Sequence, residues 1–330
     1  MRLAIILLLV ASCGTQDIVI GRDAVDPGYD TATPDTAGPD GATDDGWVAD
    51  PGSPDADRPD TELPDGHQPD PGDDPDDDPA APDTGGLCVE NNDGTIDASE
   101  MPVALGASPS YVANEPGTLA SVDVDGVADD DGGRLWDFTD GPGDAKAVLF
   151  VKAPGGYWFA AHFPDATFVS PLSVQDPSIL AAYLATSEGV WLLGIASSVE
   201  APPQGQTLLV YDTPVPLFRF PLHVGATYQA TSTFANARLM GVPQAGTEQY
   251  TITVDAQGTL KLPVFTIEHA LRLRIEVRQK FVISTSPDPI PSIQYLWVKE
   301  CVGELARATS QPGETDPKFT KAKEFRRLGL

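Results

Sequence analysis

Between residues 271 and 283 the sequence alternates between apolar and mostly charged side chains, and this pattern restricts the fold more than any other feature of the chain. The residues at 272, 274, 276, 278 and 280 are Arg, Glu or Lys, and the apolar positions between them are Leu271, Leu273, Ile275, Val277, Phe281 and Ile283. Successive side chains of a strand point to opposite faces, so a period of two predicts a strand with one buried face. Clean one-sided patterning is typical of antiparallel sheets, because parallel strands are usually buried on both faces.

Shorter β-rich runs recur along the rest of the chain, at residues 147–152, 157–163, 190–195, 207–211, 250–254 and 293–297. Pro154, Gly155 and Gly156 predict a hairpin turn between the first two runs. Only residues 177–184 favour a helix. Large aromatic residues are expected to anchor the core, and these are Trp136, Trp158, Trp191 and Trp297. We therefore predict a mainly β domain over residues 88–330, built as an antiparallel sandwich or a curved half-barrel meander.

The first residues predict an exported protein. Residues 1–12 combine a cationic start, a short apolar run and small residues, as in a secretory signal peptide. The run is shorter than the roughly 20 residues that a spanning helix needs. The stretch Val10-Ala11-Ser12-Cys13 resembles the bacterial lipobox, which implies cleavage before Cys13 and a diacylglycerol on its sulfur. The alternative is an ordinary cleaved signal peptide with an incidental cysteine.

Residues 13–21 would then form the lipid-anchor region, held in the bilayer by two or three acyl chains. Gly14 stands where an Asp would resemble the inner-membrane retention signal, so we expect the outer membrane, with the domain facing the periplasm or the cell surface.

Residues 22–87 predict a disordered acidic tether. The segment holds 20 acidic residues, two Arg and 12 Pro, out of a formal net charge of −29 for the 330-residue chain. Such a composition buries too little apolar surface to offset the entropy of ordering. A flexible coil of this length spans roughly 50 Å, which suits a spacer that holds a domain off the membrane. The alternative is a calcium-binding sponge, but a run of charges is usually only solvated, so we expect the spacer. The acidity also argues against nucleic acid as a partner, because a phosphate backbone repels such a surface.

A loop at the start of the β region is similar to the twelve-residue calcium loop of EF-hands. Oxygen ligands and the turn glycine fall at the expected positions, which are Asn91, Asp93, Thr95, Asp97 and Glu100 with Gly94 between them. Val89 occupies the first ligand position, and Pro102 follows where a helix is expected. The loop predicts either weak, millimolar calcium binding or a turn without metal.

The two remaining cysteines predict a disulfide. With Cys13 acylated, Cys88 and Cys301 are left in an oxidising compartment, where pairing is favoured. Their bond would join the start of the β domain to its last strong strand pattern. The alternative is a pair of buried free thiols. Zinc is not expected, because no His lies at ligand spacing from either cysteine.

The order of these features resembles uncharacterised lipoproteins of myxobacterial type. The residues that carry the resemblance are the lipobox, the Asp/Pro tether, the stretch 88–97 and the motif Leu135-Trp-Asp-Phe-Thr139. Residues 215–310, with the stretch 250–274, also look like meanders of lipoprotein-carrier half-barrels. That second resemblance implies a curved sheet folded over an apolar ligand or a helix.

No catalytic motif accompanies this architecture, and no catalytic residue is predicted. The histidines are scattered singly at 162, 223 and 269, without a nucleophile elbow or a zinc-binding pair. Carboxylates for glycan hydrolysis would have to come from the loop holding Asp123, Asp125 and residues 129–131. The row Arg272, Arg274, Arg278 and Lys280 is either a solvated sheet face or a site for an anionic glycan or a lipid head group.

We therefore expect a lipid-anchored envelope protein without enzymatic activity, displaying a β-rich binding or structural domain. Its partners would be the membrane, through the anchor, and an unidentified envelope protein, glycan or lipid. A carrier or sensor of an apolar ligand is the first alternative, and a glycan hydrolase is the second.

Overall fold

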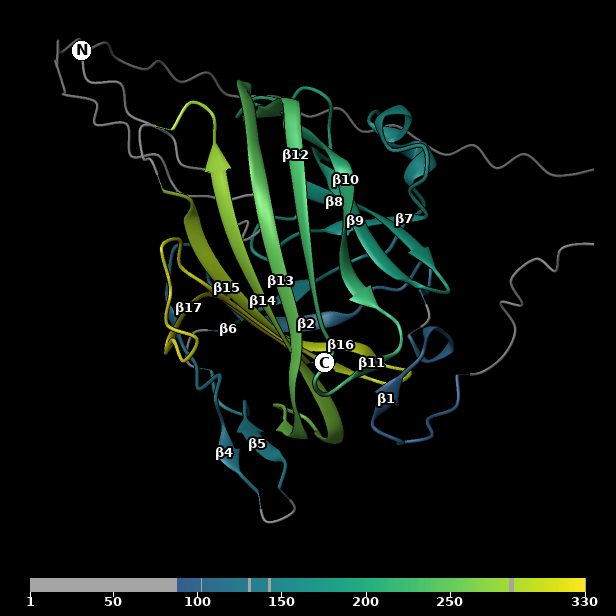
Figure 1. Cartoon of the computed structure of the whole chain (residues 1–330), viewed down its shortest axis with the longest axis vertical. Helices are drawn as coiled ribbons and strands as arrows, with labels where there is room; N and C mark the ends of the chain where they lie inside the picture. The colour runs from purple at the N-terminus through teal and green to yellow at the C-terminus, as the bar shows by residue number, and fades with distance from the viewer. Residues whose placement is uncertain (1–87, 102, 130–131, 142–143, 285–287, 330) are drawn as a thin grey trace, which may run out of the picture. The chain divides into compact units, whose positions relative to one another are not determined.

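The computed structural model describes residues 88–101, 103–129, 132–141, 144–284 and 288–329 (Figure 1). Leu87–Leu330 belongs to one compact unit. The predicted signal peptide, the acylated Cys13 and the acidic tether lie outside the described residues.

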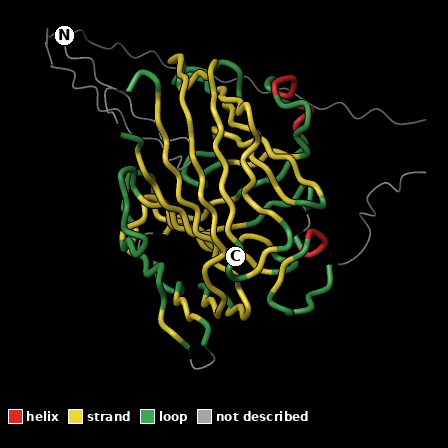
Figure 2. Tube along the Cα trace, viewed as in Figure 1, coloured by secondary structure: helices red, strands yellow, loops and turns green. Residues whose placement is uncertain are grey.

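One large sheet dominates the domain (Figure 2). Nearly all of its pairings are antiparallel, the exception being β5 with β13. Its strands neighbour one another in the order β6 (Asp144–Val148), β2 (Ser110–Asn114), β17 (Lys321–Leu328), β16 (Gly303–Ser310), β15 (Ile290–Lys299), β14 (Thr266–Phe281), β13 (Val242–Lys261), β12 (Thr227–Leu239), β10 (Leu208–Arg219), β9 (Gly189–Ser197), β8 (Ile179–Thr186) and β7 (Phe168–Pro171). Most neighbours in the chain are neighbours in the sheet, as in a meander. The mainly β, antiparallel fold class is confirmed.

Several short elements flank this sheet. Strand β1 (Thr95–Ile96) pairs with β11 (Leu222–His223), and β3 (Ala120–Ser121) pairs with β17. Strand β4 (Val127–Ala128) pairs with β5 (Arg134–Asp137), which runs parallel to β13. The helices are single 3-10 turns, η1 (Ala98–Glu100), η2 (Pro154–Gly156) and η3 (Ala160–His162). None of the helices in the described ranges is long and apolar enough to cross a bilayer.

The two ends of the sheet meet, so the strand order closes into a ring. Lys152, which follows β6, forms a bridge with Val169 of β7, and each backbone N–H donates to the other carbonyl at 3.0 and 2.8 Å. A second narrow seam lies between β10 and β12, which share the single ladder pair Leu208–Arg238. There the Asp212 carboxylate accepts hydrogen bonds from the Ser232 hydroxyl and the Thr233 N–H.

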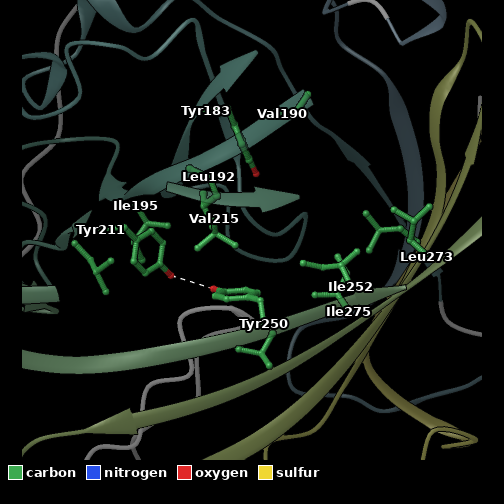
Figure 3. Packing of buried hydrophobic residues seen from close by; sticks show 14 of the residues in the cluster. Tyr183, Val190, Leu192, Ile195, Tyr211, Val215, Tyr250, Ile252, Leu273 and Ile275 are labelled. Atoms are coloured by element: carbon green, nitrogen blue, oxygen red, sulfur yellow. Dashed lines mark hydrogen bonds between the residues drawn. The ribbon is translucent and has the colours of Figure 1, made fainter. Parts of the chain in front are cut away.

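The predicted apolar face of β14 packs inside this ring. Leu271, Leu273, Ile275, Val277 and Phe281 are all buried in one cluster with side chains of β8–β13 and β15, part of which Figure 3 shows. The alternation ends sooner than the sequence indicates. Strand β14 stops at Phe281, and Ile283 is 59% exposed in the turn that follows.

A second apolar layer covers the outer face of β15–β17 and the adjoining ends of β13 and β14. Trp297 lies at its centre, in edge-to-face contact with Trp136 and Phe138 at centroid distances of 5.9 and 4.9 Å. Strand β15 therefore separates two cores: Leu296 points into the ring and Trp297 away from it. The predicted anchoring roles of Trp136 and Trp297 are confirmed, since both are fully buried.

Two local predictions are wrong. Residues 177–184 do not form a helix, because strand β8 is covered on both faces. Leu180 packs into one cluster and Ala181 into another, so no polar alternation marks the strand. The predicted strand 157–163 is instead a turn with the 3-10 segment η3, because Phe159 and Phe163 fold inward as a compact aromatic cluster.

A buried polar group interrupts the apolar interior of the ring. The Glu248 carboxylate is fully buried and accepts hydrogen bonds from the hydroxyls of Tyr211 and Tyr250 and the amide of Gln279. Figure 3 shows the two tyrosine hydroxyls in contact. Burial raises the pKa of the Glu248 carboxyl, and the three donors only partly oppose this.

Candidate functional site

A polar cleft opens along β13, where its pairing with β12 ends and its pairing with β5 begins. Its volume is about 670 Å³. The polar and charged residues that line it are Asp129, Arg134, Asp255, Gln257, Thr259, Glu268 and His269. A concave site with several convergent polar groups is the ordinary form of a ligand-binding site.

Two β-bulges between β13 and β14 turn three of these side chains into the cleft. Val254 pairs with Leu273 and Ala256 with Arg272, so Asp255 is an extra residue on β13. Further along, Gly258 pairs with Ala270 and Leu260 with Ile267, so Glu268 and His269 both oppose Thr259. His269 adopts a left-handed backbone with φ 60°, which such an irregular position permits. Bulges often re-aim side chains beside functional sites.

Close backbone packing forms the opposite wall. A Cβ atom at Gly258 would lie 1.8 Å from the Arg134 carbonyl oxygen, so only glycine lets β5 pair alongside β13 at this point. This pairing holds Arg134 at the edge of the cleft. The Arg134 guanidinium lies 3.7 Å from the Asp125 carboxylate.

Arg272 holds Asp255, one of the residues that line the cleft, in place. Its Nε donates to Asp255 Oδ1 at 2.7 Å, its Nη1 donates to the Val124 carbonyl, and its guanidinium lies 4.9 Å from the Tyr295 ring centroid. Arg272 is only 6% exposed, so it is not part of a solvated basic row as the sequence pattern suggested. Arg274 lies 3.3 Å from Glu276, and Arg278 and Lys280 are exposed.

The acidic residues considered for hydrolysis mostly hold turns together. Asp123 accepts the N–H groups of Asp125 and Gly126, and Asp129 accepts that of Gly133. A hydrogen bond from Lys318 lowers the pKa of the Asp125 carboxyl. Only Asp129 of this group lines the cleft, and residues 130–131 lie outside the described ranges.

The predicted disulfide between Cys88 and Cys301 is confirmed, with Cα atoms 5.5 Å apart. It fastens the loop 88–101 to the turn between β15 and β16. Glu300 Oε2 accepts the N–H groups of Asn91 and Asn92 at 3.0 Å each, and the buried Lys299 ammonium lies 3.6 Å from Glu90. The loop is therefore docked along its length, not only at the cysteines.

The predicted calcium ligands lie together in this loop, but protein donors occupy their oxygens. Glu100 accepts hydrogen bonds from the Asn91 amide and the Asp97 N–H, at 2.8 and 2.9 Å. Asp93 accepts the Thr95 N–H at 2.8 Å. Within the described ranges, no group of three or more His, Cys, Asp or Glu side chains is arranged to hold a metal ion. Calcium binding stays a prediction.

The loop also borders the cleft. A Cβ atom at Gly94 would lie 3.4 Å from Gln257 Oε1, so the turn of the loop contacts a cleft side chain. Val224, next to the β1–β11 pair, lines the cleft as well.

The side chains that line the cleft include both hydrogen-bond donors and hydrogen-bond acceptors. Glu268 and His269 are exposed, and their side chains make no hydrogen bond or ion pair with other described residues, so both side chains are open to a ligand. Gln257 adds an amide and Arg134 a guanidinium. Comparison with known proteins gives no match: no family model, curated protein or solved structure corresponds to this chain.

Sequence reasoning missed the cleft, although one signal was present. The adjacent polar residues Glu268 and His269 break the period of two just before the regular stretch 271–281. Two polar residues in succession interrupt the alternation of a strand, which is the change that the extra residue of a bulge produces.

Proposed function

We propose that the chain is a lipid-anchored protein of the cell envelope, acylated at Cys13, whose β domain is a binding module with the polar cleft as its site. The disulfide between Cys88 and Cys301 supports this proposal most directly, because such bonds persist mainly in exported proteins. The lipobox-like stretch and Gly14 support attachment to the outer membrane, with residues 22–87 as a spacer.

The cleft supports a binding role over a purely structural one. Its carboxylate, imidazole, amide and guanidinium groups suit a hydroxyl-rich ligand such as a glycan. Of its three carboxylates, Asp255 is paired with Arg272 and Asp129 accepts a backbone N–H. Glycoside hydrolysis needs two carboxyl groups facing the scissile bond, so this arrangement favours binding over hydrolysis.

Anchoring is tested by Cys13→Ser in the full-length chain. Metabolic labelling with a fatty-acid analogue is expected to mark the parent protein and to lose the mark completely in the variant, since the thiol is the acylated atom. The Cys88→Ser/Cys301→Ser double variant is the matched control and keeps its label. Parent protein free in the culture fluid, with an unmodified Cys13, would contradict the proposal.

Calcium binding by the loop is tested by calorimetric titration of the full-length chain and of Glu100→Gln. Residues 22–87 are identical in the two proteins, so the difference between the titrations isolates the loop. We expect a millimolar site that disappears in the variant, because Glu100 is the predicted bidentate ligand. Identical isotherms for the two proteins would remove the calcium assignment.

A further inference from the structure

Trp191 differs from the other described tryptophans. Trp136 and Trp297 are fully buried, and Trp158 packs against Phe159 and donates a 2.8 Å hydrogen bond to the Ser197 carbonyl. Trp191 is half-buried and belongs to none of the core clusters that the described residues form. Its predicted role as a core anchor is therefore wrong.

The position of Trp191 in the strand explains this. Val190 and Leu192 point into the ring, as Figure 3 shows, so Trp191 between them faces outward from β9. It pairs with Leu184 of β8 and Pro216 of β10. A Cβ atom at Gly189 would lie 2.1 Å from the Phe218 carbonyl oxygen and 3.2 Å from the indole, so this glycine is required mainly by the close pairing of β9 with β10.

An open groove of about 560 Å³ surrounds the indole. Its apolar lining residues are Leu184, Trp191 and Pro214. Its polar lining residues, which we call the rim, are Thr186, Ser187, Glu188 and Thr213. Residues 186–188 come from the turn between β8 and β9, and Thr213 from the segment in which β10 bulges between the pairs Val210–Gly194 and Val215–Leu192.

We propose that this groove binds a neutral or amino-bearing saccharide, with one sugar ring stacked on Trp191. A pyranose presents an apolar C–H face and a girdle of hydroxyls. The indole face suits the apolar C–H face of the sugar, and the carboxylate and hydroxyls of the rim suit the sugar hydroxyls. Glu188, the charged residue of the rim, repels anionic sugars and favours neutral or cationic ones. The groove is separate from the cleft, so this inference does not depend on the proposed function.

The test is calorimetric titration of the full-length protein with soluble oligomers of N-acetylglucosamine, of glucosamine and of galacturonic acid. We expect binding of the first or second and not of the third. Trp191→Ala weakens that binding by about tenfold, whereas Trp191→Phe, which keeps an aromatic face, retains most of it. Because Trp191 lies outside the core clusters, thermal unfolding of both variants should match the parent.

Two matched controls separate the groove from other surfaces. Val148→Ala alters a residue of β6 that is 55% exposed and should bind the oligomer as the parent does. Glu268→Gln alters the cleft, so comparing it with Trp191→Ala shows which of the two sites holds the oligomer. Loss of binding in Glu268→Gln but not in Trp191→Ala would overturn the proposal. So would the absence of binding to all three oligomers at millimolar concentration, or binding of a proline-rich peptide in their place.

Discussion

Replacing Cys88 and Cys301 together by serine lowers the free energy of unfolding by about 2–5 kcal/mol. The bond joins residues 213 positions apart, so its loss frees nearly the whole domain in the unfolded state. The loop-entropy model gives roughly 5 kcal/mol as an upper bound. Urea unfolding followed by tryptophan fluorescence measures the change. The slope of the transition should rise slightly, because an uncrosslinked unfolded chain exposes more surface.

Reductant provides the control for this experiment. It should shift the parent protein to the midpoint of the double variant and leave the variant unchanged. Equal midpoints for parent and variant without reductant would show that the docking of the loop through Glu300 and Lys299 holds the domain without the bond.

Glu304→Gln should lower the free energy of unfolding by a similar amount, because it breaks a nearly buried network of ion pairs on β16 and β17. Glu304 accepts hydrogen bonds from Arg307 at 2.5 Å and from Arg326 at 2.6 Å, and Arg326 is 3% exposed. Without Glu304, Arg307 loses its carboxylate partner and the buried Arg326 keeps only the longer 3.3 Å contact with Glu324. Breaking a buried pair costs about 3–5 kcal/mol at neutral pH, and we expect the loss to lie toward the lower end because Glu324 remains. Exposed pairs contribute far less, so Glu276→Gln, which loses only the contact with Arg274, is the control and should cost under about 1 kcal/mol.

The same network predicts that the free energy of unfolding depends on pH. Burial alone would raise the pKa of the Glu304 carboxyl, but Arg307 and Arg326 lower it to about 2. The unfolded chain takes up protons near pH 4.5 while the folded one does not, so stability is complete above that pH and is lost as the pH falls toward 2. The difference between parent and Glu304→Gln should shrink across this window. A difference that stays constant from pH 6 to pH 2 would show that Glu304 is not ionised in the folded protein.

The sheet was predictable wherever one face of a strand meets solvent. Strand β14 shows this best, since Leu271, Leu273, Ile275 and Val277 are all buried as the alternation indicates. Strand β8 failed the same reasoning because both of its faces are covered, which removes the polar half of the pattern. Short apolar runs of this kind do not distinguish helix from strand without their tertiary neighbours.

The candidate sites were less predictable than the fold. The disulfide followed from cysteine number and compartment, whereas the cleft depends on where bulges fall, and register is a property of paired strands. Trp191 lies within an apolar run, and only the pairing of β9 with β8 and β10 shows that it faces outward. Arg272 likewise belongs to an alternating charged row in the sequence, but in the fold its guanidinium packs against Trp136 and Tyr295 and donates to the Val124 carbonyl.

The ring closes along two thin seams, the bridge between Lys152 and Val169 and the single pair between β10 and β12. These seams divide the molecule into two arcs: β7 to β10, and β12 through β17 to β2 and β6. Within each arc, runs of paired residues join neighbouring strands, whereas few backbone pairings join one arc to the other. Side chains make up for this: apolar residues of β8–β10 pack with those of β12–β15 in one buried cluster, and Tyr211 of the first arc meets Tyr250 and Gln279 of the second at the Glu248 carboxylate. The two halves of the domain are thus joined mainly through their interior and not along their edges.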